Sequence, residues 1–220
     1  MDLEAIEIET GGTPAATVVV LHGLGADGND FVPICDELDL GGAGPVRFVF
    51  PHAPMRPVTI NGGYVMRAWY DILGADLVRR EDEAGLRASR EAIEAVLARE
   101  RARGIEAGRI VLMGFSQGCA MSLMTGLRHG ERLAGIVGLS GYLPLAALTA
   151  AERSEANRDT PVFMAHGLRD PVVPVARAIA SRDALQALGQ PVRWHEYPIE
   201  HTVSIEELRD LERWLLERLA

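Results

Sequence analysis

The sequence predicts an α/β fold in which a mostly parallel central sheet is covered by helices on both faces. Three observations support this: short β-branched apolar runs, longer segments with helical periodicity, and the alternation of the two along the chain. Parallel neighbours need a crossover connection, and a helix usually supplies it. The predicted strands are 17–21, 46–50, 109–113, 135–139, 161–165 and 192–197, with 3–9 as an additional edge strand.

Helical periodicity is present between these strands, over 81–103, 117–129, 175–188 and 204–219. The last segment repeats leucine along one face, as expected for an amphipathic helix that covers a sheet. In sheets of this kind, ligands bind at the carboxyl ends of the strands. The functional residues are therefore expected in the loops that follow the strands.

The chain has the size and composition of one globular domain, covering residues 1–220. Its 220 residues are 48% hydrophobic and 24% charged, which is close to the average for soluble proteins. The exception to regularity is 51–77, which is rich in glycine and proline yet carries many large apolar side chains. We interpret it as an irregular apolar loop that lines the cleft, either as a satellite packing cluster or as a wall over an apolar substrate.

Charge and cysteine content restrict the possible partners and compartment. The net charge is −9, and the 22 basic residues, all arginine, are scattered, so nucleic acid is not expected to bind. The acidic N-terminus lacks the basic region of a secretory signal. Glycines and a proline interrupt the uncharged stretch 133–151, so stable membrane insertion is not expected. Cys35 and Cys119 lie in different elements and indicate reduced thiols in a cytoplasmic protein.

A candidate nucleophile lies between a predicted strand and a predicted helix. The sequence Gly114-Phe115-Ser116-Gln117-Gly118 has the G-x-S-x-G pattern, in which a sharp turn exposes a serine hydroxyl above the sheet. Glycines on both sides tolerate the crowded backbone of such a turn. We predict that Ser116 is the nucleophile; the alternative is an ordinary turn with a capping serine.

A serine nucleophile needs a base, and the base needs a carboxylate that orients it. In this architecture the acid and then the histidine follow the serine, each on a loop after a later strand. Asp170 follows the strand 161–165 and His201 follows 192–197, so they are the predicted acid and base. Glu200 and Asp183 are alternative carboxylates. The remaining histidines, interpreted as structural or supporting, are His22, His52, His129, His166 and His195.

The negative oxygen formed during acyl transfer needs hydrogen-bond donors that are already in place. The backbone N–H groups of Gln117 and Leu24 are the predicted donors, the second from a glycine-rich loop after an early strand. The glycines of that loop also match a dinucleotide-binding spacing, but the acidic residue that would bind a ribose is missing. No cluster shows metal-ligand spacing, so neither a metal nor a cofactor is expected.

Taken together, these motifs resemble the phospholipase/carboxylesterase family of α/β-hydrolases, which includes carboxylesterases and acyl-protein thioesterases. The resemblance is carried by residues 21–30, 51–54, 68–72, 114–118, 166–174 and 197–201 and extends over nearly the whole chain. It implies a serine esterase that acts through Ser116, Asp170 and His201, with an acyl site near Trp69, Leu73 and Val172. A homodimer is a further possibility that the resemblance raises. Arg169 and Glu200 depart from the commonest pattern of the family.

The expected function is hydrolysis of short to medium acyl carboxylic esters through an acyl-enzyme intermediate. The segment between 139 and 161 is too short for a large cap domain, so an open site is expected. An acyl-protein thioesterase or a lysophospholipase is the alternative within the class, and a non-catalytic ligand-binding module is the alternative outside it. The expected partner is a small-molecule ester or thioester.

Overall fold

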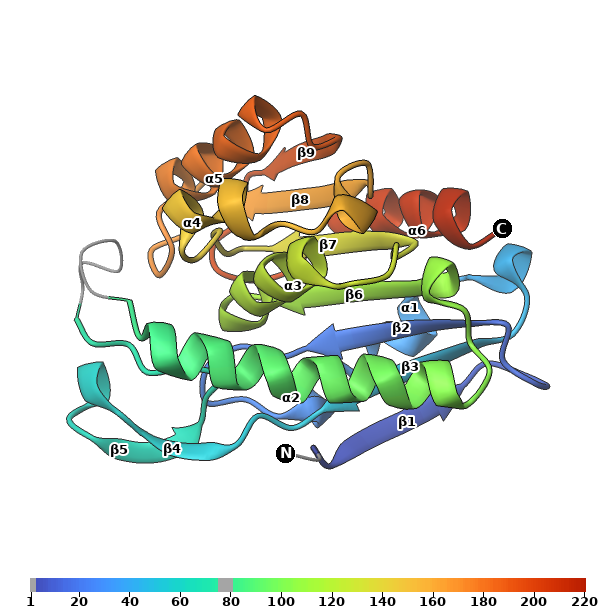
Figure 1. Cartoon of the computed structure of the whole chain (residues 1–220), viewed down its shortest axis with the longest axis horizontal. Coiled ribbons are helices and arrows are strands. Elements are labelled where there is room, and N and C mark those ends of the chain that lie inside the picture. The colour runs from blue at the N-terminus through green and yellow to red at the C-terminus, as the bar shows by residue number, and fades with distance from the viewer. Residues whose placement is uncertain (1–2, 75–80) are drawn as a thin grey trace.

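A seven-stranded sheet forms the centre of the molecule, in a computed structural model that describes residues 3–74 and 81–220. The strand order is β1-β3-β2-β6-β7-β8-β9 (Figure 1). Only β1 is antiparallel to its neighbour, so the predicted mostly parallel sheet with an additional edge strand is confirmed. The strands are β1 (Ala5–Glu9), β2 (Ala16–Leu21), β3 (Val46–Pro51), β6 (Ile110–Phe115), β7 (Gly135–Leu139), β8 (Val162–Gly167) and β9 (Val192–Tyr197).

Helices cover both faces of this sheet, as predicted. Side chains alternate along each strand, so Val19 and Leu21 of β2 pack into one core and Val18 and Val20 pack into the other. The first core is closed by α2 (Glu83–Ala102), α3 (Gln117–Arg128) and α5 (Val175–Ala187), of which α2 and α3 lie in front of the sheet in Figure 1. The second core is closed by α1 (Ile34–Glu37) and α6 (Ile205–Leu219).

The segment 51–77 is more regular than predicted as far as it is described. Residues Met55–Val58 (β4) and Tyr64–Arg67 (β5) form a two-stranded antiparallel hairpin, where we expected an irregular loop. The connection contains Gly62 and Gly63, whose φ values of 68° and 79° favour glycine. Short strands with a proline and few buried side chains give little periodic signal, which explains the error. The hairpin lies on the side to which the parallel strands point (Figure 1).

The uncharged stretch 133–151 forms β7, a loop and the first part of the short helix α4 (Ala146–Glu152), which we did not predict. Within residues 3–74 and 81–220, no helix has both the length and the apolarity that a membrane crossing requires. Cys35 and Cys119 are free thiols, as expected.

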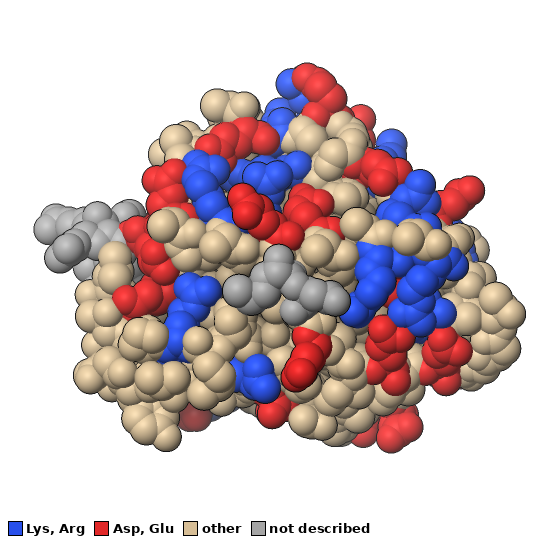
Figure 2. Space-filling model, turned by 60° about the horizontal axis from the view of Figure 1, so that its bottom comes forward, with Lys and Arg blue, Asp and Glu red and all other residues tan. Residues whose placement is uncertain are grey.

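A charged network ties the edge of the sheet to α2. The buried carboxylate of Glu100 accepts hydrogen bonds from Thr17 Oγ1 at 2.8 Å, Arg47 Nη1 at 2.9 Å and Arg103 Nη1 at 3.0 Å. A buried carboxylate is tolerated when such partners replace its water. At the surface, basic and acidic side chains lie close to one another, as the face in Figure 2 shows.

A second buried carboxylate lies at the start of α6. Ser204 and Glu207 form a reciprocal capping box, in which the Ser204 side chain accepts the Glu207 N–H at 3.1 Å. The Glu207 side chain is buried, and burial raises its pKa from the ordinary 4.5 to about 7. The charged form of Glu207 therefore opposes folding above that pH range.

The Glu207→Gln variant is expected to lose part of the pH dependence of stability. A raised pKa in the folded state adds stability below pH 4.5, and this contribution is lost as pH rises through about 7. Between acidic and mildly alkaline pH, the free energy of unfolding of wild type should therefore fall by about 3 kcal/mol relative to that of Glu207→Gln. Urea unfolding across this pH range measures the difference.

The exposed neighbour Glu206 provides the control. Glu206→Gln should keep the pH profile of wild type. Parallel profiles of wild type and Glu207→Gln would show that the Glu207 carboxylate does not titrate between the folded and unfolded states.

Candidate active site

The turn between β6 and α3 is built around two glycines and a strained serine. Ser116 has φ 56° and ψ −115°, a conformation that non-glycine residues rarely adopt. A Cβ added to Gly114 would lie 2.1 Å from the carbonyl oxygen of Gly118, and one added to Gly118 would lie 2.0 Å from that of Leu21. The two glycines therefore allow α3 to start directly against the ends of β6 and β2, which leaves the Ser116 side chain partly exposed.

The loops that follow β8 and β9 bring Asp170 and His201 to this serine. His201 Nε2 lies 2.9 Å from Ser116 Oγ, and His201 Nδ1 lies 2.6 Å from Asp170 Oδ2. The other Asp170 oxygen, Oδ1, accepts the N–H groups of Val172 and Val173, both at 2.8 Å. The three predicted residues thus form a continuous chain of hydrogen bonds across three separate loops.

The alternative carboxylates do not occupy the place of Asp170. Asp183 pairs with its neighbour Arg182 at 2.7 Å on α5, and the Glu200 side chain is exposed. Arg169 donates a hydrogen bond to the carbonyl oxygen of Pro198, which joins the acid loop to the histidine loop. The carboxylate that contacts His201 is that of Asp170.

The glycine loop after β2 lies directly beside Ser116. A Cβ added to Gly23 would lie 3.4 Å from Ser116 Cβ, and the Gly25 N–H donates to Arg67 O at 2.9 Å. Within residues 3–74 and 81–220, the N–H groups of Leu24 and Gln117 donate no hydrogen bond to the protein. Two donors beside the serine are thus free to bind an oxygen atom of a substrate.

The other histidines make contacts that support loops and elements. His22 Nε2 accepts the Ala53 N–H at 3.0 Å, and His52 Nδ1 accepts the Gly28 N–H at 3.0 Å. His129 contacts Glu94 at the end of α3, and His195 packs between the rings of Phe163 and Tyr197. Burial lowers the pKa of His22. These contacts agree with the structural or supporting roles expected from the sequence.

Apart from His201, the histidine that lies beside Asp170 is His166. Its Nε2 lies 2.8 Å from the carbonyl oxygen of Val173 and 3.4 Å from Asp170 Oδ2. Burial lowers the pKa of His166, which favours the neutral ring. A neutral ring with its proton on Nε2 donates toward the Asp170 loop and helps to hold it.

The residues predicted for substrate binding occupy different environments. Trp69 is fully buried; its Nε1 donates to His22 O at 2.9 Å and its backbone N–H donates to Gln117 Oε1 at 2.7 Å. Leu73 is half-buried, and Val172 is 60% exposed beside Asp170. Leu73 and Val172 are accessible to a substrate. Trp69 is not, and its hydrogen bond to His22 O instead supports the loop that follows β2.

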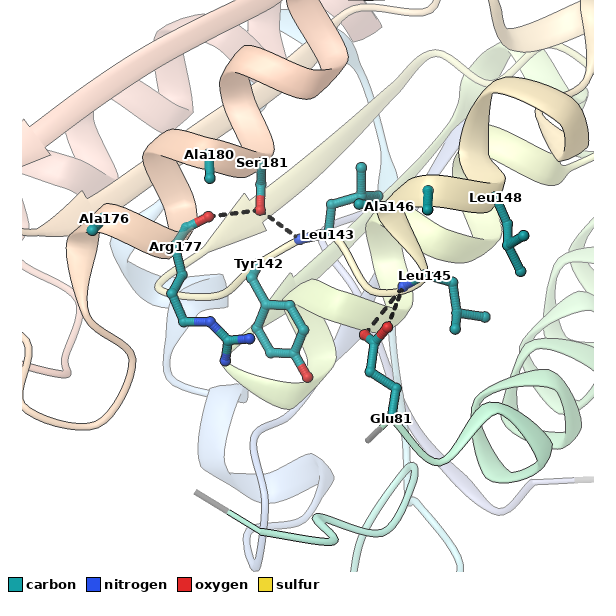
Figure 3. Close-up of a pocket in the computed structure, with 11 residues that line it drawn as sticks. Glu81, Tyr142, Leu143, Leu145, Ala146, Leu148, Ala176, Arg177, Ala180 and Ser181 are labelled. Carbon is teal, nitrogen blue, oxygen red and sulfur yellow. Dashed lines mark hydrogen bonds between the residues drawn. The ribbon is translucent and has the colours of Figure 1, made fainter. Parts of the chain in front are cut away.

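A cavity of about 550 Å³, which was not predicted from the sequence, lies between α5 and the segment 142–148 (Figure 3). Its walls include Tyr142 and Leu145, the α5 residue Arg177, and Glu81 just before α2. Tyr142 lies in the loop that follows β7, and the loops after strands are where functional residues are expected in such sheets. This position was the one signal in the sequence that could have pointed to the cavity. The α5 residues of the cavity wall come into place only through tertiary packing, so no local sequence pattern indicates them.

The chain is similar in sequence and in fold to known proteins. Residues 3–217 match the sequence profile of the family described as phospholipase/carboxylesterase. Acyl-protein thioesterase 1 of Yarrowia lipolytica is 38% identical over 220 residues, covering 98% of this chain and 97% of that protein. Among solved structures, acyl-protein thioesterase 2 of Zea mays aligns with TM-score 0.84 and 28% identity, covering 99% of each chain. Esterase PE8 aligns with TM-score 0.84 and 31% identity over 100% of each chain.

The Gly114→Ala variant is expected to disrupt the turn. The added methyl group would overlap backbone atoms of Gly118 and Cys119, which cannot move without displacing α3. Overpacking of this kind costs about 1 to 3 kcal/mol or more, so the urea midpoint should fall clearly. Gly108→Ala is the matched control, because a Cβ there would meet no atom within 4 Å. Equal stability of the two variants would contradict the close approach described here.

Proposed function

Because the chain belongs to the phospholipase/carboxylesterase family and is therefore a hydrolase, we propose that it cleaves carboxylic esters with Ser116 as the nucleophile. The observation that carries the proposal is the hydrogen-bond chain from Ser116 Oγ to His201 Nε2 at 2.9 Å and from His201 Nδ1 to Asp170 Oδ2 at 2.6 Å. This arrangement supplies the base that a serine needs and the carboxylate that fixes the orientation and tautomer of that base.

In the first half of the reaction, Ser116 Oγ attacks the carbonyl carbon of the ester and His201 Nε2 takes the hydroxyl proton. Asp170 stabilises the resulting imidazolium through its bond to Nδ1. Asp170 itself is held by two N–H donors, so it need not reorganise as the charge develops. The tetrahedral intermediate then expels the alcohol, which takes the proton from His201 and leaves the acyl group on Ser116.

The negative oxygen of the tetrahedral intermediate is assigned to the N–H groups of Leu24 and Gln117. Both groups are free of protein partners within the described chain, and both belong to segments in contact with Ser116. Donors fixed by the backbone stabilise the developing charge without first having to turn toward it. The Gln117 side chain contributes indirectly, since its two hydrogen bonds hold the backbone of Trp69 and Tyr70.

The second half repeats the same chemistry with water. His201 takes a proton from water, the resulting hydroxide attacks the acyl carbon, and Ser116 leaves with the proton that His201 returns. The products are a carboxylic acid and the regenerated enzyme. No step requires a metal or a cofactor.

An open site supports short to medium acyl esters as substrates. Between β7 and β8 the chain forms α4 and a short 3₁₀ turn over 155–157, not a cap domain. Leu73 and Val172 would contact the acyl chain. We also propose that residues 1–220 form one domain. The cytoplasmic location and the homodimer remain predictions from the sequence.

Thioester hydrolysis is the second candidate function, because relatives that match over most of their length are named acyl-protein thioesterases. The proposed chemistry is the same for both bonds, since a thiolate replaces the alkoxide as leaving group. Lysophospholipase activity is the remaining alternative in the class. The membership of the chain in a family of hydrolases argues against the alternative of a non-catalytic binding module.

The assignment of the nucleophile predicts the outcome of labelling with a fluorophosphonate. Wild type should gain one adduct in intact-mass measurements, and Ser116→Ala and His201→Ala should gain none. Asp170→Asn should keep its fold and lose on the order of 10⁴-fold in kcat for p-nitrophenyl butyrate. An adduct on Ser116→Ala, or none on folded wild type, would contradict the proposed role of Ser116.

The choice between ester and thioester is tested with matched substrates. We expect kcat/KM to be higher for p-nitrophenyl butyrate than for p-nitrophenyl laurate, because an open site contacts a long chain only in part. Butyryl and lauroyl thioesters of one thiol provide the second pair. A marked preference for the lauroyl thioester would overturn the short-chain proposal and favour the thioesterase alternative.

A further inference from the structure

The cavity beside α5 is apolar along most of its wall. Figure 3 shows it between the start of α4 and one face of α5, with Glu81 at the other side of Tyr142 from Arg177. Its apolar lining consists of Leu143, Leu145, Ala146, Ala147, Leu148, Ala176 and Ala180. Cavities of this size and character bind small molecules, and the few polar groups in them determine which ones.

Most polar groups of the cavity already have partners. The Ser181 hydroxyl donates to Arg177 O and accepts the Leu143 N–H, both at 2.8 Å. The Tyr142 hydroxyl lies 3.1 Å from that of Tyr70. Both oxygens of Glu81 lie 3.1 Å from the Leu145 N–H. These groups hold the walls of the cavity in place.

Arg177 differs from them. Its guanidinium carbon lies 4.5 Å from the centre of the Tyr142 ring, so the stacked ring fixes the plane of the cation. Within residues 3–74 and 81–220, the guanidinium makes no hydrogen bond or ion pair. The structure thus holds a half-buried, oriented cation in an apolar cavity, with its N–H donors free. A guanidinium with free donors binds a carboxylate in a bidentate manner.

The walls of the cavity are continuous with the triad loops. Tyr142 follows Gly141, and a Cβ added to Gly141 would lie 2.7 Å from the carbonyl oxygen of Ser116. On the other side, α5 starts directly after the loop that carries Asp170. The cavity therefore lies next to the turn that carries Ser116, with the segment 141–142 between the two.

We propose that this cavity is a substrate subsite for an apolar chain that ends in a carboxylate, with Arg177 as the residue that binds the carboxylate. The inference rests on the proposed function, because it assigns the substrate class of the same site. The apolar walls accept the chain and Arg177 pairs with its charged end, while the negative charge of Glu81 weakens that pairing. The carboxylate belongs either to the acyl group or to the leaving group, and the experiment separates these two sources.

The test compares matched neutral and anionic esters. On the acyl side, p-nitrophenyl octanoate is paired with the mono-p-nitrophenyl ester of octanedioic acid. On the leaving-group side, phenyl butyrate is paired with para-butyryloxybenzoate. In one of the two pairs, wild type should favour the anionic member. Arg177→Gln should lower that anionic-to-neutral ratio of kcat/KM by about tenfold or more, since it removes the charge-assisted hydrogen bonds to the carboxylate.

Two further variants and a salt series sharpen the result. Arg182→Gln is the matched control, because Arg182 also lies on α5 and stacks on an aromatic ring, that of Trp194 at 5.2 Å, but does not line the cavity. It should keep the ratio of wild type. Glu81→Gln should raise the ratio, and added NaCl should lower it in wild type. If Arg177→Gln fails to fold, Arg177→Lys, which keeps the charge but loses the bidentate geometry, replaces it and should give an intermediate ratio.

The failure of this inference can be distinguished from the failure of the proposed function. Hydrolysis that depends on Ser116, with ratios that Arg177→Gln leaves unchanged in both pairs, would overturn only the carboxylate subsite. If wild type hydrolyses none of the esters, calorimetric titration with the monoamide of octanedioic acid tests the cavity directly. Binding that weakens about tenfold in Arg177→Gln but not in Arg182→Gln would support the subsite, and no binding would overturn it.

Discussion

The close approach of α3 to the ends of β2 and β6 is the constraint on which the rest of the site depends. The helix starts where a single methyl group on Gly118 would overlap the Leu21 carbonyl. This approach forces Ser116 into its positive-φ conformation and places the Gln117 N–H beside the Ser116 hydroxyl. The same approach brings the glycine loop after β2 into contact with the serine. The proposed nucleophile and both proposed oxygen donors therefore derive their positions from one steric contact between backbones.

The proposed acid and base depend on the sheet in a different way. Asp170 and His201 follow neighbouring parallel strands, whose last paired residues are Gly167 and Tyr197. Because the register of this pair is fixed by the two cores, the loops leave the sheet at the same level and can reach one serine. Hydrogen bonds between the two loops also hold them together, including the bond from Arg169 N to Ile199 O at 3.0 Å. The geometry of the triad is thus set by strand pairing and refined by short contacts.

Local sequence signals account for most of the fold and the centre of the site. The strands and long helices have clear periodicity, and the elbow and the triad loops have glycine patterns or positions after strands that identify them. The features that escaped prediction depend on tertiary contacts. The hairpin β4–β5 exposes Met55, Tyr64 and Val65, and Val58 is its only buried strand residue, so its strands show little periodic signal. The burial of Trp69 follows from its hydrogen bonds to His22 and Gln117, and the cavity wall forms through the packing of α5. Neither feature produces a pattern in the local sequence.

The strand order has a consequence for how the protein acquires activity as it is synthesised. Ser116 follows a central strand, whereas His201 follows β9, which lies at the edge of the sheet and comes last in the chain. A growing chain can therefore pair β2, β3 and β6 and form the elbow while the base is still absent. Long-range parallel pairing is also slow compared with local helix formation. Under the proposed mechanism, the nascent polypeptide would carry an unactivated serine until the final strand docks.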